Sequence, residues 1–77
     1  MVKIFSTPTC VYCITLKKFL TEHNIEFEDI NVGEDKKALE EMVQKSGQMG
    51  VPVTEIDGQI IVGFDKNKIS ELLNIKE

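Results

Sequence analysis

Cys10 and Cys13 are the residues of this sequence best suited to do chemistry, and two residues separate them. Thiols at this spacing can exchange with a disulfide, bond to each other or supply half of a metal site. Positions i and i+3 of an α-helix lie on one face, which brings the two sulfur atoms within bonding reach. A disulfide between them closes a very small ring and would add little stability as a staple. The pair therefore favours reversible thiol–disulfide exchange.

A short strand and the helix after it must position these thiols. Residues 2–6 are mostly apolar or branched, which predicts a strand, and Pro8 disfavours helix at the residue before it. A helical pattern begins directly after the first cysteine, with Thr9 as the candidate N-cap. We expect the apolar stripe of this helix to face the core, and Lys17 and Lys18 to point the other way.

The start of this helix should make the two thiols unequal. Unpaired N–H groups and the positive end of the helix dipole favour a thiolate at Cys10. Cys13 lies inside the first turn and should be the more buried of the two. We expect the Cys10 thiolate to attack a target disulfide, and Cys13 to resolve the mixed disulfide that results.

Two other uses of the cysteines stay open. A zinc site needs four ligands, and His23 is too far along the same helix to share a metal with both cysteines. We therefore predict no metal site within one chain, and His23 reads best as a helix-end histidine. The remaining alternatives are an iron–sulfur or metal site built from Cys10 of two chains, with glutathione completing it, and plain packing of two small side chains.

The rest of the chain continues this alternation of strands and helices. The further predicted elements are a strand over 25–32 with a bend or bulge, a helix over 34–46 that ends at Gly47, strands over 53–56 and 59–62 joined by Asp57-Gly58, and a last helix that Asp65 caps and that carries Ile69, Leu72 and Leu73. The order is β-α-β-α-β-β-α. It predicts an α/β fold in which three helices cover a four-stranded mixed sheet, as a single domain over residues 1–77.

Composition narrows the classes of partner. The sequence has no Arg, and its formal net charge is −4, which argues against a nucleic-acid binder. It shows no apolar stretch of the length that a signal peptide or a membrane span requires. We therefore expect no membrane association, a cytoplasmic location where thiols stay reduced, and a monomer.

At this point the sequence resembles the glutaredoxin family. The resemblance spans residues 2 to about 73. It is carried by three segments: Thr7-Pro8-Thr9-Cys10-Val11-Tyr12-Cys13, the Val51-Pro52 pair, and the Gly63-Phe64-Asp65 turn. The family implies the thioredoxin fold and the activity of a glutaredoxin-type thiol–disulfide oxidoreductase. It also implies Cys10 as the nucleophile, Cys13 as the resolving thiol, no bound cofactor, and glutathione as a co-substrate.

The same resemblance implies where a substrate binds. Pro52 should be cis and lie against the dithiol, which leaves the Val51 backbone to pair with an extended peptide or with glutathione. The substrate-binding residues implied in this way are Thr7, Tyr12, Val51, Pro52, Gly63, Phe64 and Asp65.

The sequence departs from the common glutaredoxin pattern at the glutathione contacts. Val11 stands where Pro is usual, Thr7 where many members carry a basic residue, and Lys66 where an acid would hold the glutathione amino group. Asp65 and Lys17 could partly rebuild that site. A Val after the first cysteine and a Gly-Phe turn also occur in glutaredoxin-like redoxins that thioredoxin reductase reduces. Those redoxins donate electrons to ribonucleotide reductase, so that enzyme or a peroxidase is an alternative acceptor.

Overall fold

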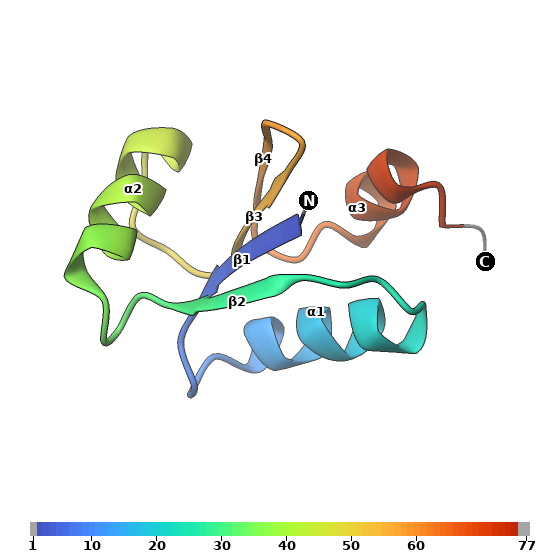
Figure 1. The fold of residues 1–77 in the computed structure, drawn as a ribbon, viewed down its shortest axis with the longest axis horizontal. Coiled ribbons are helices and arrows are strands. Elements are labelled where there is room, and N and C mark those ends of the chain that lie inside the picture. Colours follow the sequence, from blue (N-terminus) through green and yellow to red (C-terminus); the bar gives the residue numbers. More distant parts are fainter. Residues whose placement is uncertain (1, 76–77) are drawn as a thin grey trace.

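A computed structural model describes residues 2–75, which form four strands and three helices in the predicted order (Figure 1). The elements are β1 (Val2–Ser6), α1 (Val11–Glu22), β2 (Glu28–Asn31), α2 (Lys36–Ser46), β3 (Val53–Ile56), β4 (Gln59–Val62) and α3 (Lys66–Leu73). The sheet order is β2-β1-β3-β4. β1 pairs parallel with β2 and antiparallel with β3, which pairs antiparallel with β4. The predicted mixed sheet is confirmed.

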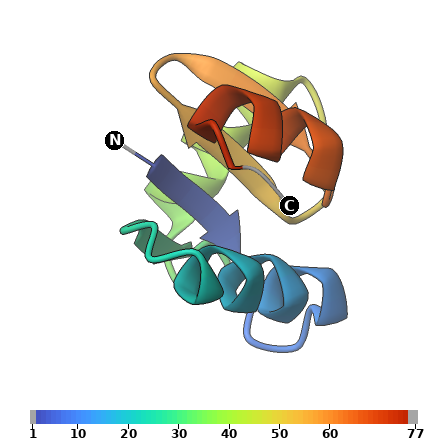
Figure 2. The same cartoon turned by 90° about the vertical axis from the view of Figure 1, so that its right-hand side faces the viewer.

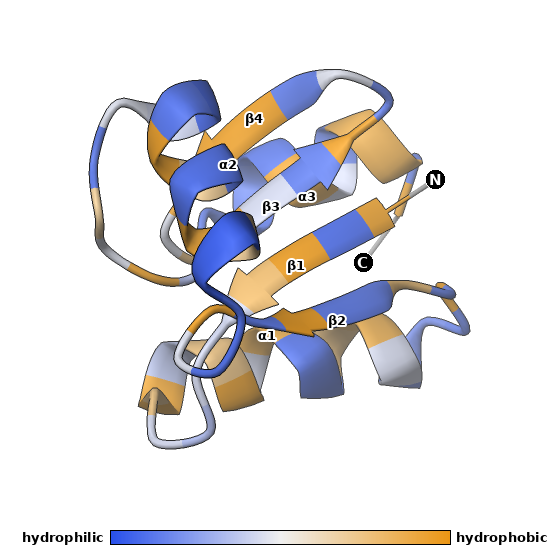
Figure 3. Ribbon diagram, turned by 60° about the vertical axis from the view of Figure 1, so that its left-hand side comes forward, coloured by the Kyte–Doolittle hydropathy of each residue, from blue (hydrophilic) through white to orange (hydrophobic). Residues whose placement is uncertain are grey.

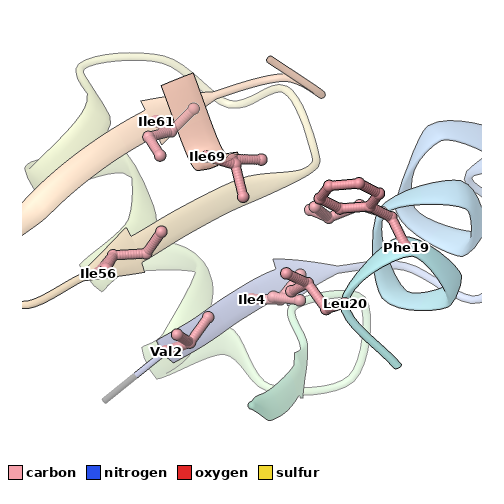
Figure 4. Packing of buried hydrophobic residues seen from close by; sticks show 8 residues of the cluster. Val2, Ile4, Phe19, Leu20, Ile56, Ile61 and Ile69 are labelled. Carbon is pink, nitrogen blue, oxygen red and sulfur yellow. The ribbon is translucent and has the colours of Figure 1, made fainter. Parts of the chain in front are cut away.

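Alternating side chains of β1 divide the core between the two faces of the sheet. Ile4 packs in a cluster with Leu20 of α1 and Ile69 of α3 (Figure 4). The next residue, Phe5, packs in a second cluster with Met42 of α2. Thus α1 and α3 cover one face and α2 the other, as Figures 1 and 2 show from two directions. Hydrophobic residues dominate β1 and β4 and alternate with hydrophilic ones along α1 (Figure 3).

The second strand is shorter than the sequence predicts. A strand over 25–32 was expected, but β2 covers only Glu28–Asn31. The reason lies at the end of α1, where Asn24 adopts the left-handed conformation (φ 58°) and Ile25 donates its N–H to the carbonyl of Leu20 at 2.9 Å. This bond closes the helix end and keeps the N–H of Ile25 out of the sheet, so pairing with β1 starts three residues later.

Caps set both ends of α2. The helix was expected from residue 34 but begins at Lys36, because the Asp35 carboxylate accepts the N–H of Ala38 at 3.1 Å and acts as the N-cap. Gly47 ends the helix in the left-handed conformation (φ 75°), as predicted. No helix within residues 2–75 is long and apolar enough to cross a membrane.

The hairpin and the last helix follow the prediction. Asp57 (φ 46°) and Gly58 (φ 86°) both have positive φ, which suits the tight turn between β3 and β4. Asp65 caps α3, and Ile69 is fully buried. The helix also carries Leu72, as predicted, but this side chain is 36% exposed.

Candidate active site

Cys10 is the N-cap of α1, so the expectation of Thr9 at this position is wrong. The Cys10 N–H donates to the carbonyl of Thr7 at 3.3 Å, and this turn carries the chain past Thr9 before the helix starts. The Cys10 carbonyl then accepts the N–H of Ile14 at 3.1 Å as the first helical bond. The Cys10 Sγ accepts the N–H of Cys13 at 3.2 Å, in the role that an oxygen plays at other N-caps. A sulfur in this position receives a donor that stabilises negative charge on it.

The loop before β3 reaches the same sulfur from the other side. The Cys10 Sγ lies 3.8 Å from the carbonyl oxygen of Val51, across 41 residues of sequence. The Val51–Pro52 peptide bond is cis, and Pro52 is fully buried. The family resemblance implied this placement, and the structure confirms it.

Cys13 occupies the opposite environment. Its side chain is 0% exposed, whereas Cys10 is partly exposed, and both thiols are free. Burial, together with the hydrogen bond to Cys10 and the charge of Cys10, raises the pKa of Cys13 to about 11, against the lowering effects of the Thr7 backbone and the Lys17 charge. The site therefore holds one accessible sulfur and one shielded sulfur that is reluctant to ionise.

Tyr12 and Val11 stand between the cysteines and face solvent. Their side chains are 66% and 71% exposed, so neither enters the core. Thr7, which was implied as a substrate contact, is half-buried in the turn before α1. Exposed apolar side chains beside a reactive thiol are available to a docking substrate.

The turn after β4 joins the cis-proline loop. Gly63, with φ 78°, donates its N–H to the carbonyl of Pro52 at 2.8 Å, so this turn lies beside the Val51–Pro52 segment. The ring of Phe64 packs edge-on against Phe19 with 5.9 Å between centroids. Asp65 accepts the N–H of Lys68 at 3.1 Å as the cap of α3. Phe64 and Asp65 thus make structural contacts at positions that the family resemblance implied for substrate.

Lys66, the next residue, interacts with the core aromatic of α1. Its ammonium lies 5.6 Å from the centroid of the Phe19 ring, a cation–π distance. His23, at the end of the same helix, holds its Nδ1 2.8 Å from the carbonyl oxygen of Phe19. Its position fits the expected helix-end histidine. Among residues 2–75, no group of three or more His, Cys, Asp or Glu side chains could hold a metal ion.

Lys17 is less exposed than its place opposite the apolar stripe of the helix predicts. Its ammonium donates to Asp29 Oδ2 at 2.9 Å and to Ser6 Oγ at 3.5 Å, and only 23% of its side chain is exposed. Ser6 Oγ in turn donates to Asp29 Oδ1 at 2.7 Å. Partial burial raises the pKa of Asp29, but the Ser6 and Lys17 hydrogen bonds and the Lys17 charge outweigh it and lower the pKa below its ordinary value. One signal was available: Lys17 follows Cys13 by four residues, which places both on one face of the helix.

Comparison with known proteins identifies the family. The glutaredoxin family model matches residues 2–61. The chain is 53% identical over 73 residues to an uncharacterized glutaredoxin-like 8.6 kDa protein in the rubredoxin operon of Clostridium pasteurianum, covering 95% of this chain and 97% of that protein. It is 32% identical over 72 residues to the glutaredoxin-like protein NrdH of Lactococcus lactis subsp. lactis, covering 94% of this chain and 99% of that protein.

The fold agrees with solved structures. The glutaredoxin of Archaeoglobus fulgidus superposes with a TM-score of 0.85 at 28% identity, covering 94% of this chain and 84% of that one. The family match, the sequence relatives, the sheet order and the CxxC pair at the start of α1 all agree. The chain therefore belongs to the glutaredoxin family and is a thiol–disulfide oxidoreductase with the thioredoxin fold.

Proposed function

We propose that this oxidoreductase works by dithiol exchange, with Cys10 as the nucleophile and Cys13 as the resolving thiol. The observation that carries the proposal is the contrast between the two sulfurs. The Cys10 Sγ is partly exposed and accepts the N–H of Cys13 at 3.2 Å, whereas Cys13 is 0% exposed. A target disulfide therefore meets Cys10 first, and the donated N–H favours the thiolate that must attack.

The proposed reaction moves two electrons from the dithiol to the target. The Cys10 thiolate attacks one sulfur of the target, so a Cys10–target disulfide forms and the other target sulfur leaves as a thiolate. Cys13 then loses its proton and attacks the Cys10 Sγ. The Cys10–Cys13 bond forms, and the second target thiolate leaves. Both leaving thiolates take up protons from solvent, and the target is reduced while the enzyme is oxidised.

The Val51 backbone supports the proposed substrate-binding site beside Cys10. Its carbonyl lies 3.8 Å from the Cys10 Sγ, and no partner for the Val51 N–H is found among the described residues. An extended peptide or glutathione that pairs with this backbone would bring its own sulfur to Cys10. We propose the surrounding contacts to be Thr7, Tyr12, Pro52, Gly63, Phe64 and Asp65. Tyr12 is exposed, and the Gly63 N–H donates to the Pro52 carbonyl, which supports this proposal.

We propose protein and glutathione mixed disulfides as substrates, with no bound cofactor and glutathione as the co-substrate. The chain would act as a monomer in the reducing cytoplasm. The contacts expected to bind glutathione are weak, however. Thr7 supplies no cation, and Lys66 supplies a cation where an acid would bind the glutathione amino group. Two lost charge-assisted bonds correspond to roughly ten- to several-hundred-fold weaker binding.

A second candidate reductant is thioredoxin reductase, with ribonucleotide reductase or a peroxidase as the electron acceptor. The observation that favours it is that two residues of the turn expected to bind glutathione make contacts within the protein instead. Asp65 caps α3 through the N–H of Lys68, and the Lys66 ammonium lies over the Phe19 ring. The 32% identity to a glutaredoxin-like protein named NrdH is consistent with this choice.

The decisive experiment compares two reductants on the oxidised protein. Millimolar glutathione is set against NADPH with thioredoxin reductase, and the loss of the Cys10–Cys13 disulfide is followed over time by acid quenching, alkylation of the free thiols and mass spectrometry of the protein. Fast reduction by glutathione supports the first candidate, whereas slow reduction by glutathione with fast reduction by thioredoxin reductase supports the second. Thr7→Lys is the variant to compare with the natural sequence. It places a cation where many glutaredoxins carry one to bind glutathione, so it should speed reduction by glutathione only.

Two cysteine variants test the dithiol mechanism itself. Cys10→Ser should abolish turnover with either reductant, and Cys13→Ser should trap the mixed disulfide with the target. Full activity of Cys10→Ser would contradict the proposed nucleophile. Trapped adducts are detected by mass spectrometry of the unreduced protein.

A further inference from the structure

A polar cluster lies beside the buried thiol of the dithiol. Ser6 at the end of β1, Asp29 on β2 and Lys17 on α1 form a closed set of contacts, with distances of 2.7, 2.9 and 3.5 Å between their polar atoms. Ser6 is only 2% exposed. The three side chains come from three elements, so the fold holds the Lys17 ammonium at a defined place one helical turn after Cys13.

Cys13 has to ionise at a site that opposes ionisation. Burial contributes most to its raised pKa, followed by its hydrogen bond with Cys10. The charged groups acting on its sulfur are Cys10, which disfavours the thiolate, and Lys17, which favours it. Once Cys10 is bonded to a target it carries no charge. Burial then still raises the pKa of Cys13, whereas the Thr7 backbone and the Lys17 charge lower it. Among residues 2–75, Lys17 is the full positive charge that favours this thiolate.

We propose that the Lys17 ammonium, held in place by Asp29 and Ser6, stabilises the Cys13 thiolate while it resolves the mixed disulfide. This inference rests on the proposed dithiol function. Lys17 acts through its charge, and Asp29 and Ser6 are positioning residues because they act through Lys17. In the step concerned, Cys13 gives its proton to solvent and its thiolate bonds to the Cys10 Sγ. The target sulfur leaves with the electron pair of the broken disulfide and takes a proton from solvent.

The geometry favours Lys17 over the other cations of the helix. Lys18 is the next residue and is exposed, so it points away from the dithiol. The Lys17 charge lowers the pKa of Cys13, and the Asp29 carboxylate holds the Lys17 ammonium in place at 2.9 Å. Two hydrogen-bond acceptors also limit the rotamers of a side chain that is otherwise highly mobile.

The expected effect follows from the chemistry of thiolates. Lys17 has the smallest of the influences on the Cys13 pKa, and its ammonium is partly exposed and paired with Asp29, so about one pKa unit, the low end for a nearby opposite charge, is the upper bound of its effect. One unit lowers the thiolate fraction about tenfold, and the greater nucleophilicity of a more basic thiolate recovers about threefold. Removing the charge of Lys17 should therefore slow resolution by up to about threefold at neutral pH.

The experiment separates the two steps with 5,5′-dithiobis(2-nitrobenzoate) and the reduced protein in a stopped-flow instrument. Attack by Cys10 releases one thionitrobenzoate at a rate proportional to reagent concentration. Resolution by Cys13 releases the second at a rate that does not depend on it. Lys17→Met should slow the second phase and leave the first unchanged, and Lys17→Arg should restore it. Lys18→Met is the matched control and should change neither phase.

The pH profile distinguishes charge from mere packing. Loss of a stabilising charge shifts the profile of the second phase to higher pH, so the deficit shrinks as Cys13 approaches full ionisation. Displacement of Cys13 would slow the phase equally at every pH. An unshifted pH profile in Lys17→Met, or no rescue by Lys17→Arg, would overturn the inference about Lys17. If release still occurred in two phases, the proposed dithiol function would not be affected. Two-phase release from Cys10→Ser would instead overturn the proposed function.

Discussion

The inequality of the two thiols predicts selective alkylation. Iodoacetamide added to the reduced, folded protein at neutral pH should modify Cys10 and leave Cys13 almost untouched. The reason is that iodoacetamide reacts with an accessible thiolate. Cys10 is partly exposed, whereas Cys13 is 0% exposed.

The size of the effect can be worked from the pKa of Cys13. Burial first, and then Cys10, raise this pKa from 9.0 to about 11, which lowers the thiolate fraction about 100-fold at neutral pH. A more basic thiolate is also a stronger nucleophile, and this raises the reactivity of the ionised Cys13 about tenfold. Ionisation alone thus slows Cys13 about tenfold relative to the unfolded chain. Complete burial slows it further, because the chain must open locally before the reagent can enter.

The assay follows both cysteine-containing products by peptide mass spectrometry over time, in buffer and in denaturant. In denaturant the two cysteines should react at similar rates, since the burial is gone. Cys13→Ser serves as the control for the rate of Cys10 alone. Equal alkylation of Cys10 and Cys13 in buffer, with the circular dichroism spectrum of the folded protein intact, would refute the reasoning from burial.

Three further predictions concern stability. Thr54 is 0% exposed, and its hydroxyl has no hydrogen-bond partner among the described residues, so Thr54→Val should stabilise the fold by about 1 kcal/mol and raise the thermal midpoint by about 4–8 °C. Thr21→Val, which alters an exposed hydroxyl, is the control and should change stability by less than about 0.5 kcal/mol. Because folding lowers the pKa of Asp29 from 3.8, the ionised carboxylate contributes to the free energy of unfolding above pH 3.8. This contribution is lost as the pH falls through the lower pKa of the folded state. Asp29→Asn should therefore flatten this part of the acid unfolding curve. Gly63→Ala should cost about 1 kcal/mol in denaturant unfolding, because φ is 78° while nothing lies within 4 Å of the added Cβ; an unchanged midpoint would show that the turn relaxes.

Much of the fold can be predicted from local sequence, because the turns and helix caps that determine it involve only a few neighbouring residues. The Asp57-Gly58 turn, the left-handed Gly47 and the Asp65 cap each depend on one side chain or its absence. The spacing of Cys10 and Cys13 likewise indicates redox chemistry without any knowledge of the sheet. Element bounds were less well predicted, since the end of α1 withdrew Ile25 from β2.

Other features required the tertiary structure, because they join residues that are distant in sequence. The approach of Val51 to the Cys10 sulfur spans 41 residues, and it was expected from the family resemblance rather than from any local pattern. The burial that separates Cys13 from Cys10 in reactivity arises where α1 packs on the sheet. The pattern of the helix alone put Lys17 in solvent. Only the parallel pairing of β2 with β1 sets Asp29 beside Ser6, and so turns a surface lysine into a fixed charge near the buried thiol.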